Sequence, residues 1–106
     1  NQLRKLGSLS KNRKLSVLDL NDNELEELPD LSGNKRLVEL KLSNNRLRAL
    51  PDLSSNEELT WVEVANNRLR KLPNFESNPH IWFLNVSDNL LMKLPRLNLE
   101  NLTVVD

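Results

Sequence analysis

The 106-residue chain has no cysteine and few of the other residues that usually carry chemistry. It therefore forms no disulfide and offers no thiol nucleophile, a composition that fits a reducing compartment. Gly7 and Gly33 are the only glycines, which excludes a glycine-rich phosphate loop. His80 is the only histidine, and no metal-ligand spacing is present. We therefore expect no metal, no cofactor and no catalytic set of nucleophile, base and orienting group.

Net charge and long apolar runs are also lacking. Fifteen Lys and Arg balance fifteen Asp and Glu, so the formal net charge is zero. No overall field then draws the chain to nucleic acid or to a membrane surface. No apolar run approaches the roughly 20 residues that a membrane-spanning helix needs. Neither nucleic acid nor membrane is an expected partner.

What the sequence does have is a register of apolar residues that returns every 22 residues. Counted from the first residue of each repeat, apolar side chains occupy positions 1, 4, 6, 11, 14 and 17, with Asn at position 9 and Pro at position 15. The full copies begin at Leu15, Leu37, Leu59 and Ile81. A fixed period of this length is typical of stacked arrays, whose units are too small to fold alone.

These copies resemble the leucine-rich repeat family, whose signature is L-x-x-L-x-L-x-x-N-x-L followed by a variable return segment. The copies read LSVLDLNDNELEELPDLSGNKR, LVELKLSNNRLRALPDLSSNEE, LTWVEVANNRLRKLPNFESNPH and IWFLNVSDNLLMKLPRLNLEN. They are most similar to the short repeats of intracellular members such as the regulatory subunit of the type-1 protein phosphatase. The chain departs from that subfamily, which usually has Leu in the return segment, by carrying Asn12, Asn34, Asn56 and Asn78 there.

The resemblance implies an α/β-type solenoid: a curved array with a parallel β-sheet on its concave face and mostly irregular or 3-10 convex segments. The residue pattern agrees with this fold, because the apolar positions 4 and 6 flank an outward position 5. This alternation has the two-residue period of a short strand. The Pro at position 15 favours extended or turn geometry in the return path. The position-9 residues Asn23, Asn45, Asn67 and Asn89 follow the strands. Buried amides there can satisfy backbone groups of neighbouring repeats, so we expect a continuous Asn ladder. The Asn series in the return segment is expected to form a similar ladder on the convex side.

The chain is expected to be one continuous array. A partial repeat covers 1–14, full repeats cover 15–36, 37–58, 59–80 and 81–101, and a further repeat starts at 102–106. Both ends fall in mid-repeat without a polar cap, so we expect a segment of a longer protein.

Three of the four aromatic residues fall on the outward, concave positions: Trp61, Trp82 and Phe83. Only Phe75 takes a core position, although the core is where folding needs large apolar side chains. Grouped exposed aromatics are the usual anchors of protein interfaces. Leu90 and Met92 are apolar where other repeats carry charge, and we predict that they extend this patch. Two repeat positions are expected to form rows across the concave face. Position 3 reads Val17, Glu39, Trp61, Phe83 and Val104, and position 5 reads Asp19, Lys41, Glu63, Asn85 and Asp106.

Other interpretations of these surfaces stay open at this point. The aromatic residues could pack against another part of the same polypeptide or a large assembly, or could stiffen the sheet by cross-strand pairing. Beyond the strands, Arg46, Arg48, Arg68 and Arg70 form a basic flank. It is either a solvated surface or a rim for an acidic or phosphorylated segment.

The sequence predicts a noncatalytic protein–protein interaction scaffold that binds a protein partner through its concave face. The predicted binding residues are Val17, Asp19, Glu39, Lys41, Trp61, Glu63, Trp82, Phe83, Leu90 and Met92. An intracellular, cytoplasmic location is expected. Two alternatives are a regulatory or targeting module of a larger enzyme or assembly (phosphatase, kinase, cyclase or ligase) and an extracellular receptor or adhesion ectodomain.

Overall fold

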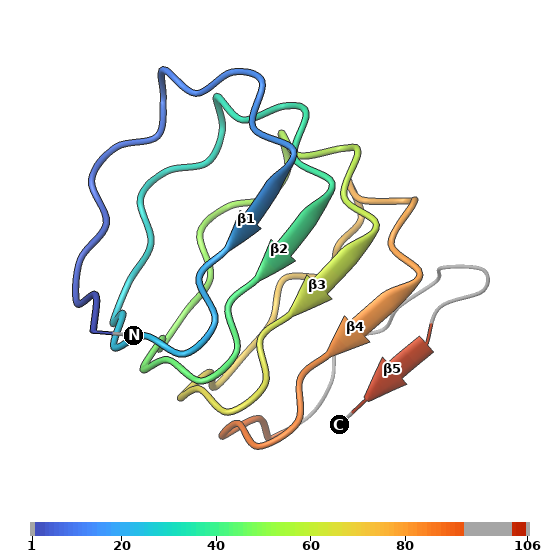
Figure 1. Ribbon diagram of the computed structural model, residues 1–106. Helices are drawn as coiled ribbons and strands as arrows, with labels where there is room; N and C mark the ends of the chain where they lie inside the picture. The colour runs from blue at the N-terminus through green and yellow to red at the C-terminus, as the bar shows by residue number, and fades with distance from the viewer. Residues whose placement is uncertain (1, 93–102, 106) are drawn as a thin grey trace.

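The computed structural model describes residues 2–92 and 103–105, which wind into a curved solenoid (Figure 1). Five parallel strands form one sheet in the order β1-β2-β3-β4-β5. Their bounds are Val17–Asp19 for β1, Glu39–Lys41 for β2, Trp61–Glu63 for β3, Phe83–Asn85 for β4 and Thr103–Val105 for β5. The predicted solenoid with a parallel sheet is confirmed. The described residues contain no helix, and turns take the place of helices in the return segments.

Each strand has three residues, and only its middle side chain points into the core. Leu18, Leu40, Val62 and Leu84 are the middle residues of β1 to β4, and all four are buried. The residues on either side of them are exposed or half-buried. This alternation follows from the period of two along a strand. The sheet therefore has one apolar inner face and one face open to a partner.

The core is a set of stacked columns that follow the repeat. Leu25, Leu47 and Leu69 form one such column and are completely buried. Phe75 fills the position held by Leu31 and Leu53 in the preceding repeats and is also buried, as the sequence predicts. Equivalent residues pack on one another because consecutive repeats are superimposed by the strand register. Each repeat thus completes the core of its neighbours.

A buried ladder of Asn side chains lies where the strands end, as predicted. The Asn45 amide nitrogen donates to the carbonyl oxygens of Leu42 at 3.1 Å, Ser43 at 3.3 Å and, in the preceding repeat, Leu20 at 2.9 Å. Its amide oxygen accepts the backbone N–H of Leu25 at 3.0 Å. Asn67 repeats this pattern one turn later. One side chain thus bonds to backbone groups of two repeats, and it supplies the acceptor that the buried N–H of Leu25 needs.

The second Asn series forms a ladder on the convex side. The Asn56 amide nitrogen donates to the carbonyl oxygens of Leu31 at 3.0 Å and Asn34 at 2.9 Å in the preceding repeat. Its own backbone closes a turn, with its N–H donating to Leu53. Asn34 and Asn78 make the matching contacts. The Asn that replaces the usual Leu therefore stitches the return segments together with hydrogen bonds.

The register of β5 differs from the sequence prediction. Thr103 pairs with Phe83 and Val104 with Leu84, whereas the sequence analysis placed Val104 beside Phe83 on the concave face. Val104 instead packs against the core. The strand offset is 20 residues here and 22 between the earlier strands. That predicted position of Val104 is therefore wrong by one residue. The boundary predicted at residue 101 and the concave position given to Asp106 lie outside the described residues.

Removing one ladder amide should destabilise the fold more than removing an exposed amide next to it. We expect Asn67→Ala to lower the free energy of unfolding by about 3 kcal/mol, because the buried Leu47 N–H loses its acceptor and three backbone carbonyl oxygens each lose one donor. Urea unfolding followed by circular dichroism measures the change.

The matched control is Asn66→Gly, because the Asn66 side chain makes only one, exposed hydrogen bond, to Asn44, and its φ of 54° is a backbone conformation that glycine adopts without strain. Its effect should stay within about 0.5 kcal/mol. Equal losses in the two variants would contradict the assigned role of the ladder.

Candidate binding surface on the concave face

The strand register brings the predicted concave residues into two rows that cross the sheet. One row reads Val17, Glu39, Trp61, Phe83 and Thr103, and the other reads Asp19, Lys41, Glu63, Asn85 and Val105. Strands in a sheet lie about 4.8 Å apart, so neighbours within a row are in reach of one another. The predicted placement of these side chains on one face is therefore correct up to β4.

The three outward aromatic residues form a single cluster. Trp61 and Phe83 are register partners, and their rings stack with centroids 4.0 Å apart at an interplanar angle of 21°. Trp82, immediately before β4, meets Trp61 edge to face at 5.2 Å and Phe83 at 6.2 Å. Trp61 and Phe83 are half-buried by this packing, whereas 49% of Trp82 is exposed. The aromatic cluster thus presents Trp82 as its most accessible member.

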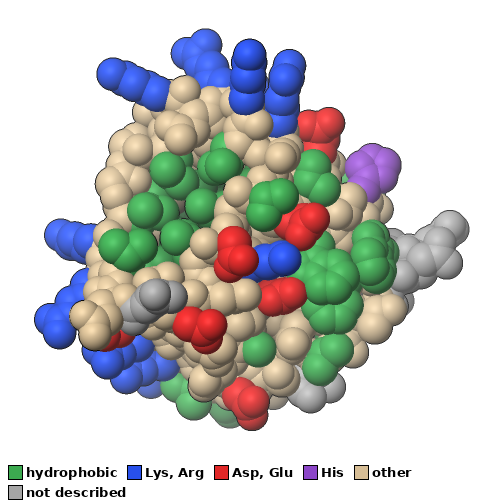
Figure 2. All heavy atoms as spheres, in the orientation of Figure 1, with side chains coloured by type: hydrophobic (Ala, Val, Ile, Leu, Met, Phe, Trp, Pro, Cys, Tyr) green, Lys and Arg blue, Asp and Glu red, His purple; other side chains and the backbone are tan. Residues whose placement is uncertain are grey.

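Acidic side chains lie beside the aromatic cluster. The indole N–H of Trp61 donates to Glu63 Oε1, which fixes the carboxylate against the ring. The other oxygen of Glu63 has a long contact of 3.5 Å with the Asn21 amide nitrogen. Lys41 forms an ion pair with Glu39 at 3.5 Å. Figure 2 shows acidic side chains next to the hydrophobic group over β3 and β4, surrounding a basic one.

Leu90 and Met92 lie apart from the aromatic cluster along the chain. Trp82 precedes β4, whereas Leu90 and Met92 follow the turn beyond its other end. The Leu90 backbone N–H donates to Leu69 of the preceding repeat at 2.9 Å. Leu90 is 53% exposed and Met92 is 93% exposed. Both are therefore exposed beyond the end of β4 that lies away from Trp82, and their union with the aromatic cluster stays a prediction.

A third polar ladder borders the concave face, and the sequence analysis did not identify it. Asp22, Asn44, Asn66 and Asp88 all adopt positive φ values, between 54° and 62°. The Asn44 amide nitrogen donates to Asp22 Oδ1 at 2.6 Å, and Asn66 donates to Asn44 Oδ1 at 2.9 Å. The signal was an Asp or Asn at position 8 of every repeat, since these residues tolerate the left-handed conformation best after glycine.

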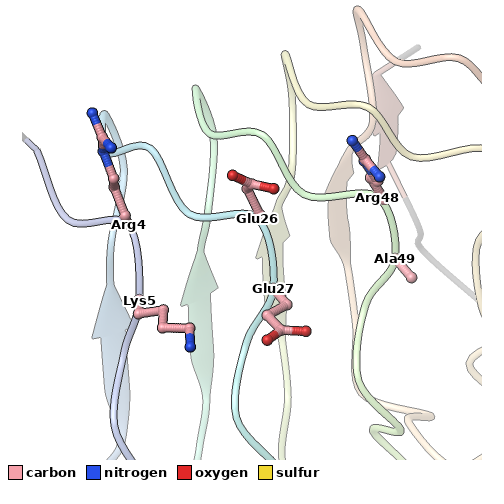
Figure 3. A pocket seen from close by; sticks show the side chains of 6 residues that line it. All are labelled: Arg4, Lys5, Glu26, Glu27, Arg48 and Ala49. Atoms are coloured by element: carbon pink, nitrogen blue, oxygen red, sulfur yellow. The ribbon is translucent and has the colours of Figure 1, made fainter.

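Other surfaces of the described residues are less suited to a site. A shallow pocket on the flank is lined by Arg4, Lys5, Glu26, Glu27, Arg48 and Ala49, from three successive turns (Figure 3). Its charges alternate in sign from turn to turn, as in a solvated surface. On the same flank, Arg4 and Arg46 both pair with Glu24, at 3.4 Å and 3.7 Å. The expected basic flank is therefore partly neutralised.

Groups that could perform chemistry are dispersed. Among residues 2–92 and 103–105, no group of His, Asp or Glu side chains is arranged to hold a metal ion. His80 is exposed in a return segment. The pKa of Asp30, also in a return segment, is lowered by hydrogen bonds from the backbone N–H and the hydroxyl of Ser32. In this same part of the chain, no helix has the length and apolar character needed to cross a membrane.

The solenoid, the parallel strand ladder and the Asn ladders define a leucine-rich repeat protein. A family model for leucine-rich repeats in two copies matches residues 13–55. The chain belongs to the leucine-rich repeat proteins.

Solved structures of YopM are similar over the whole chain. YopM from Yersinia enterocolitica WA-314 is 37% identical with a TM-score of 0.87, and this chain covers 22% of its length. YopM from Yersinia pestis, described as a leucine-rich effector protein, is 29% identical with a TM-score of 0.63, and 40% of it is covered. No curated protein sequence matches the chain. The fold and these relatives support a protein-interaction scaffold, and such modules are typically noncatalytic.

The positive φ of the third ladder gives a test at Asn44. We expect Asn44→Ala to be about 1 kcal/mol less stable than Asn44→Gly, because alanine is strained in the left-handed region and glycine is not. Both variants lose the same side-chain hydrogen bonds, so the difference isolates the backbone. Thermal and urea unfolding of the two proteins measure it. An alanine variant at least as stable as the glycine variant would rule out a left-handed turn at this residue.

Proposed function

We propose that the chain binds a protein partner through its concave face, with Trp61, Trp82 and Phe83 as the hydrophobic anchors. The observation that carries this proposal is the aromatic cluster itself. Three of the four aromatic side chains lie together on the open face of the sheet, and Trp82 is half exposed. Large aromatic side chains grouped at the surface contribute most of the binding energy of typical interfaces.

The surrounding residues have supporting roles in this proposal. Asp19, Glu39, Lys41 and Glu63 lie in the two rows that cross the sheet and provide charges that select and orient the partner. Val17 is 44% exposed at the edge of the sheet and adds apolar contact area. Leu90 and Met92 give a second apolar contact beyond the strands.

The proposal includes a noncatalytic role in the intracellular compartment. The cysteine-free sequence supports this location, since disulfides are a feature of proteins in oxidising compartments. Fractionation of cells that carry the tagged full-length protein tests it, and recovery of the protein in the medium would contradict it.

Trp82→Ala is the sharpest test of the anchors. Trp82 is the most exposed aromatic, so its truncation should remove contact area without disturbing the Trp61–Phe83 stack. We expect the affinity for the partner to fall by about 2 kcal/mol, while stability falls by about 1 kcal/mol as the two edge-to-face ring contacts of Trp82 are lost. Quantitative affinity capture with the full-length protein identifies partners lost by the variant, and calorimetry with the purified partner gives the affinity change.

His80→Ala is the matched control, because His80 is exposed two residues earlier but lies in a return segment. It should bind as the unaltered protein does. Partners retained by Trp82→Ala and lost by His80→Ala would move the binding surface to the convex side. If Trp82→Ala loses no partner but unfolds more easily, the cluster serves packing instead.

A further inference from the structure

We infer that the partner of the concave face is recognised through a basic segment, in which an Arg or Lys stands next to an apolar side chain. This inference deepens the proposed function and rests on it. Three features carry it: the sign of the charges on the open face, the position of the Glu63 carboxylate, and the way in which the face holds Lys41.

The charged side chains of the concave face are mostly acidic. The whole chain is formally neutral. Across the described strands, however, the acidic residues are Asp19, Glu39 and Glu63, and the only basic residue is Lys41. Asp22 and Asp88 add two carboxylates at the turns that border the face. Apart from one basic side chain among the acidic ones, the basic side chains visible in Figure 2 lie at the edges of the molecule. The open face is thus complementary to a positively charged ligand.

The aromatic cluster and a carboxylate are held in contact. Trp82 lies 5.2 Å from Trp61, and the Trp61 indole N–H is bonded to Glu63. The exposed Trp82 ring and the Glu63 carboxylate therefore both contact the indole of Trp61. A guanidinium or ammonium can lie over an exposed Trp ring while its charge is paired with a nearby carboxylate. The apolar stem of the same Arg or Lys can contact the remaining aromatic surface.

Glu63 has acceptor capacity to spare for such a ligand. A carboxylate offers about four lone-pair sites. One oxygen of Glu63 accepts the Trp61 indole N–H, and the other has only the long contact with Asn21. Because the indole fixes the orientation of the carboxylate, little side-chain freedom is lost when a ligand binds. Glu63 is a positioned acceptor beside a hydrophobic anchor.

Lys41 shows how this face accommodates a cation. In the strand register it stands between Asp19 and Glu63, and it pairs with Glu39 within its own strand. One ammonium does not neutralise three carboxylates. The arrangement leaves acidic capacity next to the cluster, and it disfavours an acidic or phosphorylated ligand, which would meet like charges.

Selection of linear random peptides displayed on phage tests the inference. The full chain is the target, with Trp82→Ala and Glu63→Gln as counter-targets. We expect the recovered peptides to be enriched in Arg or Lys beside apolar residues. Synthetic copies should bind about tenfold more weakly to Glu63→Gln and more weakly still to Trp82→Ala, and higher salt should weaken binding. Gln keeps an oxygen that can accept the Trp61 N–H, so the cluster should persist.

Matched controls separate charge from shape. Glu57→Gln removes an exposed carboxylate from a return segment and should leave affinity unchanged. Replacing the peptide Arg by citrulline removes charge with little change of shape. Its effect should vanish in Glu63→Gln if the two groups are in contact. Asp19→Asn, at an exposed position, provides a second neutralised variant if Glu63→Gln folds poorly.

The outcomes distinguish this inference from the proposed function. Peptides that need Trp82 but lack basic residues, or that bind Glu63→Gln as well as the unaltered protein, would overturn the basic-segment inference and leave the concave anchors in place. If no recovered peptide depends on Trp82, both proposals are wrong.

Discussion

The hydrogen bonds of the buried position-9 Asn side chains are the constraint on which this solenoid depends. A strand of three residues makes few ladder hydrogen bonds, and the chain must then turn inward and bury backbone groups. Asn45 solves this problem for two repeats at once, since it donates to three carbonyl oxygens and accepts one N–H. A side chain lacking either donor or acceptor could not replace it. The position of the Asn therefore determines where each strand ends and how closely repeats stack.

That stacking determines what the open face can present. Because the ladder holds equivalent positions in register, outward residues 22 positions apart become neighbours irrespective of their identity. Trp61 and Phe83 stack because the register pairs them, and no core requirement selects them. Lys41 lies between Asp19 and Glu63 for the same reason. The backbone is thus specified by leucine and asparagine, which leaves the outward positions free to encode recognition.

The difference between the repeated Leu and Asn residues and the variable outward residues explains which features the sequence predicts. Leucine spacing and the two Asn series predict the strands, the core and both buried ladders, because each feature recurs in every repeat. Unique features are harder to predict. Thr103 lies opposite Phe83 because the last strand offset is shorter, and no repeated residue marks this change. The Trp61–Glu63 hydrogen bond depends on side-chain rotamers, which the sequence does not specify. Leu90 and Met92 are recognisable as apolar in the sequence, but this does not show that β4 lies between them and Trp82. The third polar ladder, which includes Asn44, is predictable in principle, since a positive φ favours Asn and Asp.

Neutral net charge and an acidic open face together limit how this surface can work. With no overall charge, the chain exerts little attraction at distances beyond the Debye length, about 8 Å at physiological ionic strength. The carboxylates near Trp82 then influence a ligand mainly after it has reached the surface. Hydrophobic contact with the aromatic cluster would provide most of the affinity, and the fixed carboxylate of Glu63 would discriminate among apolar ligands by their charge. A rigid sheet suits this division, because the ring and the carboxylate are already in place before binding.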